Sequence, residues 1–134
     1  MKYLLDTCIV SKFLKDDFCV SKHLERTDPN DLGISIITKL EINYGFALHP
    51  NNFQKQRKRW ENFCTVVQTY PFGDSEQIAA VEIKTALHKQ GKMIGSFDIL
   101  IAATAQARKI TCVTNNTHEF IRVSELNLVD WTQE

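Results

Sequence analysis

Short runs of apolar residues alternate along this chain with segments in which the apolar residues recur at helical spacing. A run of a few apolar residues is typical of a strand buried on both faces of a parallel sheet. Five such runs, which predict strands, cover residues 3–5, 32–37, 65–70, 110–114 and 126–129. The intervening segments predict helices at residues 8–14, 20–26, 38–49, 53–64, 74–90, 95–105 and, after a turn, within 115–120. This alternation predicts an α/β fold, with a parallel sheet centred on the first strand and helices on both faces.

Local capping signals mark where several of these helices begin and end. Thr38 and Glu41 have the spacing of a capping box, and Asp74 and Gln77 form a similar pair. Gly91 stands where a helix commonly ends in a left-handed residue. We therefore expect one helix to begin at Thr38, and another to begin at Asp74 and to end near Gly91.

Two of the predicted helices differ in how their apolar residues are distributed. In the helix at 74–90, Lys84 and Lys89 are expected to face solvent. The residues of this helix expected to face the core are Ile78, Val81, Ile83 and Leu87. The helix that opens at Gly95 is apolar on all sides between residues 99 and 105, which predicts that it is buried.

The composition is that of an ordinary globular protein. The 134 residues fit one domain, 1–134, and 43% of them are hydrophobic and 24% charged. Sixteen basic and sixteen acidic residues cancel, which excludes a surface that is basic throughout but leaves room for a local basic patch. No apolar run approaches the ~18 residues of a membrane-spanning helix. With no leader peptide expected before the first strand, we expect a cytoplasmic protein that does not enter a membrane.

Two further features leave alternatives open. The four cysteines are scattered without a C-x-x-C pair, so free thiols in a reducing cytosol are the simplest interpretation. The segment 53–60 is basic and ends in an aromatic residue, and it is either a solvated helix face or a patch for phosphate or an acidic partner. Its charged residues and its terminal aromatic are Lys55, Arg57, Lys58, Arg59 and Trp60.

Four acidic residues recur near the starts of predicted helices, and they are Asp6, Glu41, Asp98 and Glu119. Each has a local explanation, since an acid can cap a helix or complement its dipole. Asp6 can cap the helix after the first strand, and Glu119 can complete a cap with Asn116. Taken together, however, the four acids indicate a site, because the carboxyl ends of parallel strands share the edge at which ligands bind.

Clustered carboxylates need either protons or a cation to offset their repulsion. Two like charges ~4 Å apart repel by roughly 4 kcal/mol at an effective dielectric near 20. Oxygen ligands suit Mg²⁺, with Mn²⁺ as the alternative, whereas no histidines are spaced to bind zinc. Such a metal would activate water for phosphodiester hydrolysis. The sequence has neither a nucleophilic triad nor a glycine-rich phosphate loop, so we expect no covalent mechanism and no nucleotide cofactor.

The segments that carry these acids resemble the PIN-domain ribonucleases, and specifically the VapC toxins of bacterial toxin–antitoxin pairs. The similar segments are residues 3–7, 36–41, 95–102 and 113–120, with shorter matches at 90–92 and 130–131. They follow one another in order over the whole chain. The resemblance implies that Asp6, Glu41 and Asp98 bind the divalent metal. It places Glu119 at a fourth position, where it either contacts the metal or holds a metal-bound water.

The resemblance also assigns supporting residues around the acids. It implies that Thr114 and Asn116 line the site, and Thr7 stands directly after the first acid. One departure is Cys8, since the family commonly has Asn at this position. A thiol is a weaker hydrogen-bond donor than an amide, so a contact behind the metal ligands is expected to differ here.

For the molecule as a whole, the resemblance implies a three-layer α/β/α sandwich with a central parallel five-stranded sheet. It further implies a homodimer, inhibition by a small cognate antitoxin protein, and Mg²⁺-dependent cleavage of RNA, often tRNA. We expect the antitoxin to cover the acidic edge and to bring an Arg or Lys to the carboxylates, with the segment 53–60 as a second contact. The alternative is a non-catalytic PIN-fold module that binds RNA or protein, but the presence of all three core acids favours the enzyme.

Overall fold

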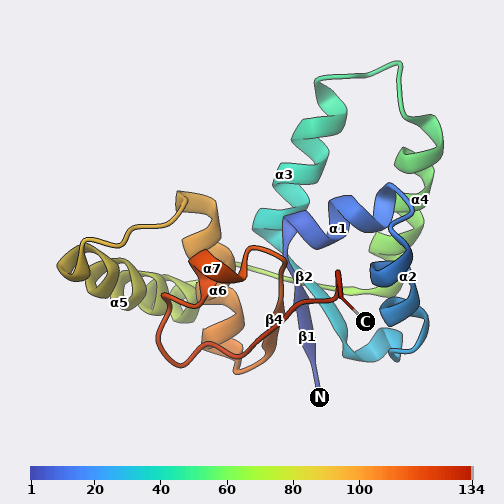
Figure 1. Ribbon diagram of the computed structural model, residues 1–134. Helices are drawn as coiled ribbons and strands as arrows, with labels where there is room; N and C mark the ends of the chain where they lie inside the picture. The colour runs from blue at the N-terminus through green and yellow to red at the C-terminus, as the bar shows by residue number, and fades with distance from the viewer. Residues whose placement is uncertain (134) are drawn as a thin grey trace.

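The computed structural model describes residues 1–133, and a five-stranded sheet lies at its centre (Figure 1). Every pair of neighbouring strands is parallel, and the strand order β3-β2-β1-β4-β5 places the first strand in the middle, as predicted. The strands are β1 (Tyr3–Leu5), β2 (Leu32–Ser35), β3 (Gln68–Tyr70), β4 (Thr111–Val113) and β5 (Leu128–Val129). In the central register, Leu4 of β1 aligns with Gly33 of β2 and with Cys112 of β4.

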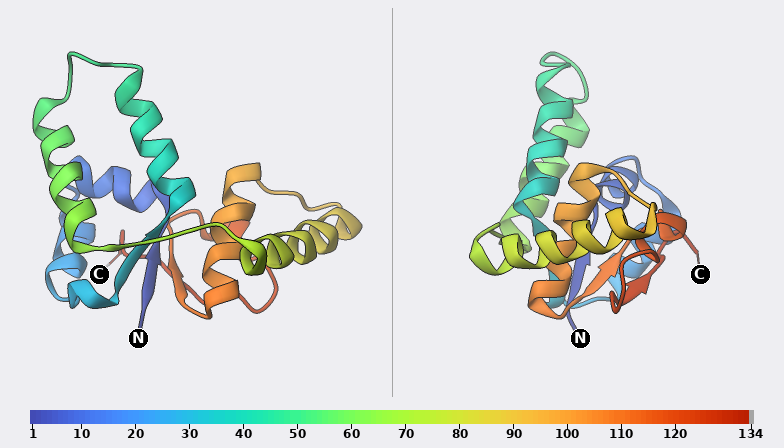
Figure 2. Two further views of the ribbon diagram at one scale, coloured as in Figure 1. Left: turned by 180° about the vertical axis from the view of Figure 1, so that it is seen from behind. Right: turned by 90° about the vertical axis from the view of Figure 1, so that its left-hand side faces the viewer.

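Helices cover both faces of the sheet, which confirms the three-layer α/β/α fold (Figure 2). They are α1 (Thr7–Leu14), α2 (Phe18–Glu25), the short 3-10 helix η1 (Pro29–Asp31), α3 (Ile36–Ala47), α4 (Gln54–Val66), α5 (Asp74–Gln90), α6 (Ser96–Arg108) and α7 (Thr117–Phe120). Leu4 packs in a core with α5, α6 and α7, whereas the next residue, Leu5, packs in a core with α1 to α4. Successive side chains of a strand point to opposite faces, so one short apolar run supplies both cores.

The start of α3 differs from the prediction. The helix begins at Ile36, two residues earlier than expected, because the hydroxyl of Ser35 accepts a hydrogen bond from the Thr38 amide at 3.0 Å. The expected capping box between Thr38 and Glu41 is therefore wrong, and Glu41 lies in the second turn of α3. Similarly, the predicted strand at 65–70 is only three residues long, since α4 continues to Val66.

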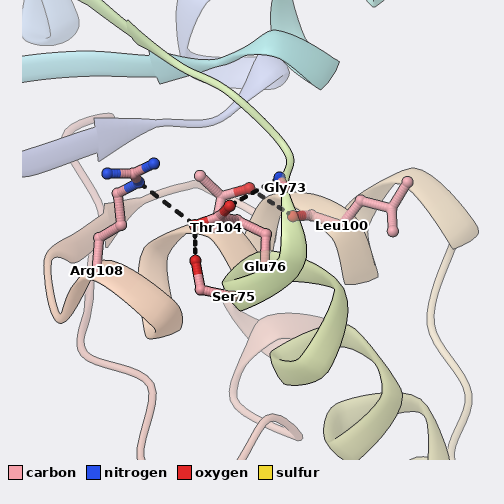
Figure 3. A network of polar contacts seen from close by, with 6 residues as sticks. All are labelled: Gly73, Ser75, Glu76, Leu100, Thr104 and Arg108. Carbon is pink, nitrogen blue, oxygen red and sulfur yellow. Dashed lines mark hydrogen bonds and ion pairs between the residues drawn. The ribbon is translucent and has the colours of Figure 1, made fainter.

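The helix α5 spans residues 74–90 as predicted, but its N-cap lies one residue before Asp74, the predicted cap. Gly73 is the N-cap, and Glu76 rather than Gln77 reaches back to accept from the Gly73 amide at 2.8 Å (Figure 3). The helix packs on α6 through a face that repeats every three or four residues and includes Glu76, Ile83 and Leu87.

Two residues that were expected to lie on the buried face of α5 are exposed. Ile78 and Val81 are each 56% exposed, because they fall outside the spacing of the face that meets α6. Ile83 and Leu87 are buried, as predicted. The helix α5 therefore carries more apolar residues than α6 covers.

The helices α3 and α4 form a hairpin that projects beyond the sheet, and α1 lies between them (Figure 1). Two residues of the basic segment 53–60, Arg57 and Trp60, stabilise this hairpin. Arg57 donates to the carbonyls of Phe46, His49 and Asn52, at 3.1, 2.7 and 3.2 Å, and so ties the connection to the start of α4. Trp60 is buried, whereas Lys55 and Lys58 remain exposed.

Within residues 1–133, no helix combines the length and the apolar character that crossing a bilayer requires. All four cysteines are free, with Cys112 buried and Cys8, Cys19 and Cys64 partly exposed. The expectation of free thiols is therefore confirmed.

Candidate active site

The four candidate acids all lie at the carboxyl edge of the sheet, although they come from distant parts of the chain. Asp6 joins β1 to α1, Glu41 follows β2, and Glu119 lies in α7 after β4. Asp98 stands in the first turn of α6. Because β1, β2 and β4 are neighbours in a parallel sheet, their carboxyl ends meet, and the charges of Asp98 and Glu41 act on Asp6.

Asp6 caps a helix and lies at the carboxyl edge of the sheet, so its capping role leaves a role in the site open. Its Oδ1 accepts a hydrogen bond from the Ile9 amide at 2.9 Å, which caps α1. The side chain is only 3% exposed. Burial is the main cause that raises the pKa of Asp6 from 3.8 to about 6, against the hydrogen bonds from Thr114 and Ile9. The negative charges of Asp98 and Glu41 raise it further.

Asp98 is partly buried, and a glycine makes room for it. A Cβ atom on Gly95 would lie 3.2 Å from Oδ2 of Asp98, closer than most real contacts allow. Burial raises the pKa of Asp98, and the neighbouring charges of Glu119 and Glu41 raise it as well. The glycine before α6 therefore has a steric role, since any larger residue at position 95 would crowd the Asp98 carboxylate.

A pair of threonine hydroxyls positions Glu41. The Thr7 hydroxyl donates to Oε1 of Glu41 at 2.6 Å, and the hydroxyl of the buried Thr38 lies 3.1 Å from Thr7 Oγ1. The sequence pattern predicts a capping role for Thr38 and does not indicate its contact with Thr7. The signal that could have revealed it is the Ser35-x-x-Thr38 spacing, which moves the cap to Ser35 and frees the threonine hydroxyl.

Glu119 is held by the amide of Asn116, which donates from Nδ2 to Oε2 of Glu119 at 2.8 Å. The side chain of Asn116 makes no capping bond to the start of α7, so the expected cap by this side chain is wrong. Instead, the backbone amide of Asn116 donates to Thr114 Oγ1 at 2.9 Å. Thr114, which is fully buried, therefore links the Asn116 turn to Asp6.

Cys8 makes a contact that the sequence did not indicate. Its thiol donates to Oδ1 of Asn115, a residue 107 positions away. Burial raises the pKa of the Cys8 thiol, and the charge of Asp6 raises it further, so the sulfur stays protonated and can donate. The contact joins the start of α1 to the turn after β4, on either side of Asp6.

The donor set of this edge is made of carboxylate and hydroxyl oxygens, and the residues present fit a hard divalent cation. Three of the four carboxylates use one oxygen in a hydrogen bond within the protein, and among residues 1–133 no three His, Cys, Asp or Glu side chains converge into a ready metal cage. A cation that keeps several of its waters, as Mg²⁺ does, needs no such cage. A cavity of about 330 Å³, lined by Glu41, Asp98 and the 95–97 segment, opens beside these acids.

Comparison with known proteins places this arrangement in a family. The PIN domain matches residues 3–126, and the chain belongs to the PIN-domain family. Ribonuclease VapC2 of Rickettsia felis is 34% identical over 98% of both chains. The tRNA(fMet)-specific endonuclease VapC of Shigella flexneri is 29% identical over 98% of this chain and 99% of its own length.

Solved structures agree with this assignment. A chain in the crystal structure of VapBC2 from Rickettsia felis, bound to a DNA fragment from the promoter, superposes with a TM-score of 0.89. It is 30% identical and covers 98% of this chain and 99% of its own. Within the PIN family, this protein is thus an endoribonuclease of the VapC type, the toxin of a toxin–antitoxin pair. The non-catalytic alternative is not favoured, because the named relatives are nucleases.

Proposed function

We propose that this protein hydrolyses RNA, with tRNA as the first class of substrate to test, at the carboxylate edge of its sheet. The observation that carries the proposal is that four acids from four elements lie at one edge of the sheet, where two of them have raised pKa values. PIN-domain ribonucleases use a divalent metal, and Mg²⁺ or Mn²⁺ suits these oxygens. When bound, the metal supplies a water of lowered pKa and neutralises charge on the phosphate. One relative is named for cleavage of tRNA(fMet), which supports tRNA as a substrate class.

The residues of the chain take distinct roles in this proposal. Asp6, Glu41 and Asp98 would hold the cation, since they lie at one edge and the charge of Glu41 acts on both Asp6 and Asp98. Thr7 fixes one oxygen of Glu41, and the Thr114 hydroxyl steadies Asp6.

Glu119 has a supporting role in the proposal, because its Oε2 is already engaged by Asn116. We assign it to a water of the cation rather than to the cation itself. We further propose that residues 1–134 act as one nuclease unit and that the protein works in the cytoplasm, where its RNA substrates lie.

The test is cleavage of total tRNA by the purified protein with Mg²⁺, with EDTA, and with EDTA followed by excess Mn²⁺. We expect cleavage with Mg²⁺, none with EDTA, and restoration by Mn²⁺. Glu41→Gln should lose cleavage, whereas the matched control Glu61→Gln, an exposed acid on α4, should keep it. Cleavage that persists in EDTA would refute the metal-dependent mechanism.

Metal affinity offers a second test that needs no RNA. Because the carboxylates do not form a cage and Mg²⁺ retains waters, we expect weak binding by the protein alone. Calorimetry should give a dissociation constant far above the nanomolar range. A nanomolar affinity for Mg²⁺ would show that the site is preformed, which this proposal excludes.

We also propose that a cognate antitoxin inhibits the enzyme by covering the acidic edge with an Arg or Lys. Solved relatives include VapBC complexes, which supports a protein partner of this kind. A cation from the partner would offset the same carboxylates that hold the metal. Lys55 and Lys58 remain exposed on α4 and provide the second contact. A structure of the complex that leaves both the acidic edge and α4 uncovered would refute this arrangement.

Finally, we propose that the protein is a homodimer that pairs through α3. The helix and its C-cap, Leu48, expose an apolar stripe spaced four residues apart. Its members are Ile36, Leu40, Tyr44 and Leu48, which are 41%, 52%, 62% and 57% exposed. A second copy of the same chain would bury the stripe symmetrically. Leu40→Arg should shift the mass measured by light scattering from dimer to monomer, whereas Val66→Arg, on α4, should not. A wild-type protein that is monomeric at all concentrations would contradict the proposal.

A further inference from the structure

Beside the acids lies a cavity to which the catalytic proposal assigns no role. Its volume is about 310 Å³, within the range of about 300–1,000 Å³ that is typical of small-molecule sites. The cavity shares two residues, Thr7 and Glu41, with the acidic edge. Its remaining lining comes from α1, α3 and the start of α4, and includes Ser11, Lys15, Gly45, Phe46, Phe53 and Gln56.

We propose that this cavity receives one unpaired base of the RNA, next to the phosphate that is cut. The inference rests on the proposed ribonuclease function and deepens it. Both nucleotides at the scissile phosphate are covalently tied to it, so a cavity that shares Glu41 with the metal-binding acids lies within reach of an adjoining base. Apolar walls suit its faces, and Ser11 and Gln56 can bond its edges.

Phe53 provides the most specific support for this assignment. Its φ of 60° places it in the left-handed region, where a bulky residue is an outlier. It also occupies the N-cap of α4 without any capping hydrogen bond, a position at which Ser, Thr, Asp or Asn is preferred. The ring is nevertheless 50% exposed and lines the cavity. A strained, exposed aromatic residue is costly for folding, and such strain is typical of functional positions.

The surroundings hold this ring in place. Arg57 binds the carbonyls of Phe46, His49 and Asn52 and lies 4.8 Å over the Phe46 ring, which braces the connection on which Phe53 sits. His49 meets the Phe53 ring nearly at a right angle, with centroids 5.6 Å apart. An aromatic residue on a braced turn is suited to stacking on a base, because little ordering is needed on binding.

Gly45 opens the cavity from the side of α3. It stands within the helix, four residues after Glu41, where glycine lowers helix stability relative to alanine. No atom lies within 4 Å of the position that a Cβ would take. Close packing therefore does not require a glycine at this position. A larger side chain here would fill the cavity. Lys15, at the cavity wall, supplies a positive charge for the RNA backbone.

The test combines variants that act on the cavity in opposite ways. Phe53→Asn removes the ring, and Asn tolerates the left-handed conformation and can cap α4. We expect this variant to melt at or above the wild-type temperature. We also expect its KM for a short RNA that the wild type cuts to rise by about 10–100-fold, with little change in kcat. Gly45→Leu should raise KM similarly by filling the cavity. Phe53→Trp, which keeps an aromatic ring, should raise KM less than Phe53→Asn does. The control Phe18→Ala, which removes an exposed ring on α2, should stay within a few-fold of wild type.

A binding measurement separates this inference from the proposed function. The probe is a single-stranded RNA oligonucleotide with one 2-aminopurine. It is mixed with the Asp98→Asn protein, so that it stays intact and the measurement reports binding alone. Stacking on Phe53 should quench the fluorescence, and Phe53→Asn should abolish the quenching. A protein that quenches the probe but cuts no RNA would refute the ribonuclease mechanism and support the base-binding cavity. If both Phe53→Asn and Gly45→Leu keep the wild-type KM and the wild-type quenching, the inference is overturned. If these variants lose only antitoxin binding, the cavity belongs to the protein partner instead.

Discussion

Two buried carboxylates in this protein, Asp6 and Glu76, have nearly the same exposure and opposite electrostatic surroundings. Asp6 is 3% exposed and Glu76 is 2% exposed. Burial by itself would raise the pKa of both carboxyl groups, because it disfavours the charged form. For Glu76, hydrogen bonds from the Gly73 amide and the Ser75 hydroxyl, each at 2.8 Å, together with the charge of Arg108, outweigh burial and lower the pKa (Figure 3). For Asp6, the neighbouring charges are those of Asp98 and Glu41, and the pKa is about 6.

The difference teaches that burial of an acid does not by itself indicate a functional site, whereas lack of charge compensation does. Within residues 1–133, the two ion pairs join Arg59 to Asp16 and Arg108 to Glu76. Neither pair includes an acid of this edge, so no ion pair among the described residues offsets the charges there, which protons or a bound cation can balance. Glu76 is balanced internally, and its role is to fix the start of α5 against α6.

The largest expected effect separates the two acids by activity. Asp6→Asn and Asp98→Asn should each lower the rate of RNA cleavage by more than about 100-fold, the upper end of what loss of a residue behind the metal ligands costs. They should also relieve growth inhibition when expressed in cells. Glu76→Gln should cleave at nearly the wild-type rate at a temperature where it is folded. Full activity in either Asp variant, measured on purified and folded protein, would show that the site is assigned wrongly.

The second prediction concerns stability and its dependence on pH. Because the folded state binds the Asp6 proton more tightly than the unfolded state does, Asp6 lowers the free energy of unfolding as pH rises from about 4 to about 6. The pKa difference between 3.8 and about 6 means that ionised Asp6 destabilises the folded state by about 3 kcal/mol above this pH range. Below the range this destabilisation vanishes. In EDTA, Asp6→Asn, which can still cap α1, should be more stable than wild type at pH 7 by up to this amount.

Urea unfolding at several pH values measures this effect. The two proteins should converge near pH 4, and Mg²⁺ should stabilise the wild type but not the variant at neutral pH. An Asp6→Asn protein that is less stable than wild type across the whole range would mean that the Asp6 charge is well compensated in the fold.

Glu119 is the intermediate case, an acid at the edge that has its own donor in Asn116. Glu119→Gln should lower cleavage by about 10–100-fold, the usual cost of removing a group that acts through a metal-bound water. Raising Mg²⁺ or supplying Mn²⁺ should restore part of the rate. Complete loss at every metal concentration would instead make Glu119 a direct ligand, and the matched variant Glu125→Gln, in an exposed turn, should behave as wild type.

The smallest effect is expected at the compensated acid. Glu76→Gln should lower the free energy of unfolding by about 1–2 kcal/mol, because the hydrogen bonds to a charged group are weakened while the shape is kept. Arg108→Met should cost less, since the Arg108 side chain is 34% exposed and water screens its charge. Thermal melting of both variants measures the order. A larger loss for Arg108→Met would mean that its packing over Tyr70, at 4.8 Å, matters more than the ion pair.

Several features of this protein could be predicted from local sequence. Apolar runs and helical spacing identified all five strands and the parallel α/β class, because a strand buried on both faces needs uninterrupted apolar residues. Four acids near helix starts indicated one edge, since the carboxyl ends of parallel strands converge there. Their placement at that edge agrees with the prediction, while their roles as metal ligands remain a prediction.

Tertiary structure decided what sequence spacing leaves ambiguous. Ser35 and Thr38 both satisfy the spacing of a helix cap. In the fold Ser35 caps α3, while the Thr38 hydroxyl lies 3.1 Å from that of Thr7, a residue distant in sequence. The face of α5 that is buried depends on α6, so Ile78 is exposed although its apolar character suggested otherwise. Asp6 and Glu76 are alike as sequence signals, because each lies at the start of a helix. Their difference comes from residues far along the chain, such as Arg108 and Asp98, since electrostatic energy depends on distance in space rather than on separation in sequence.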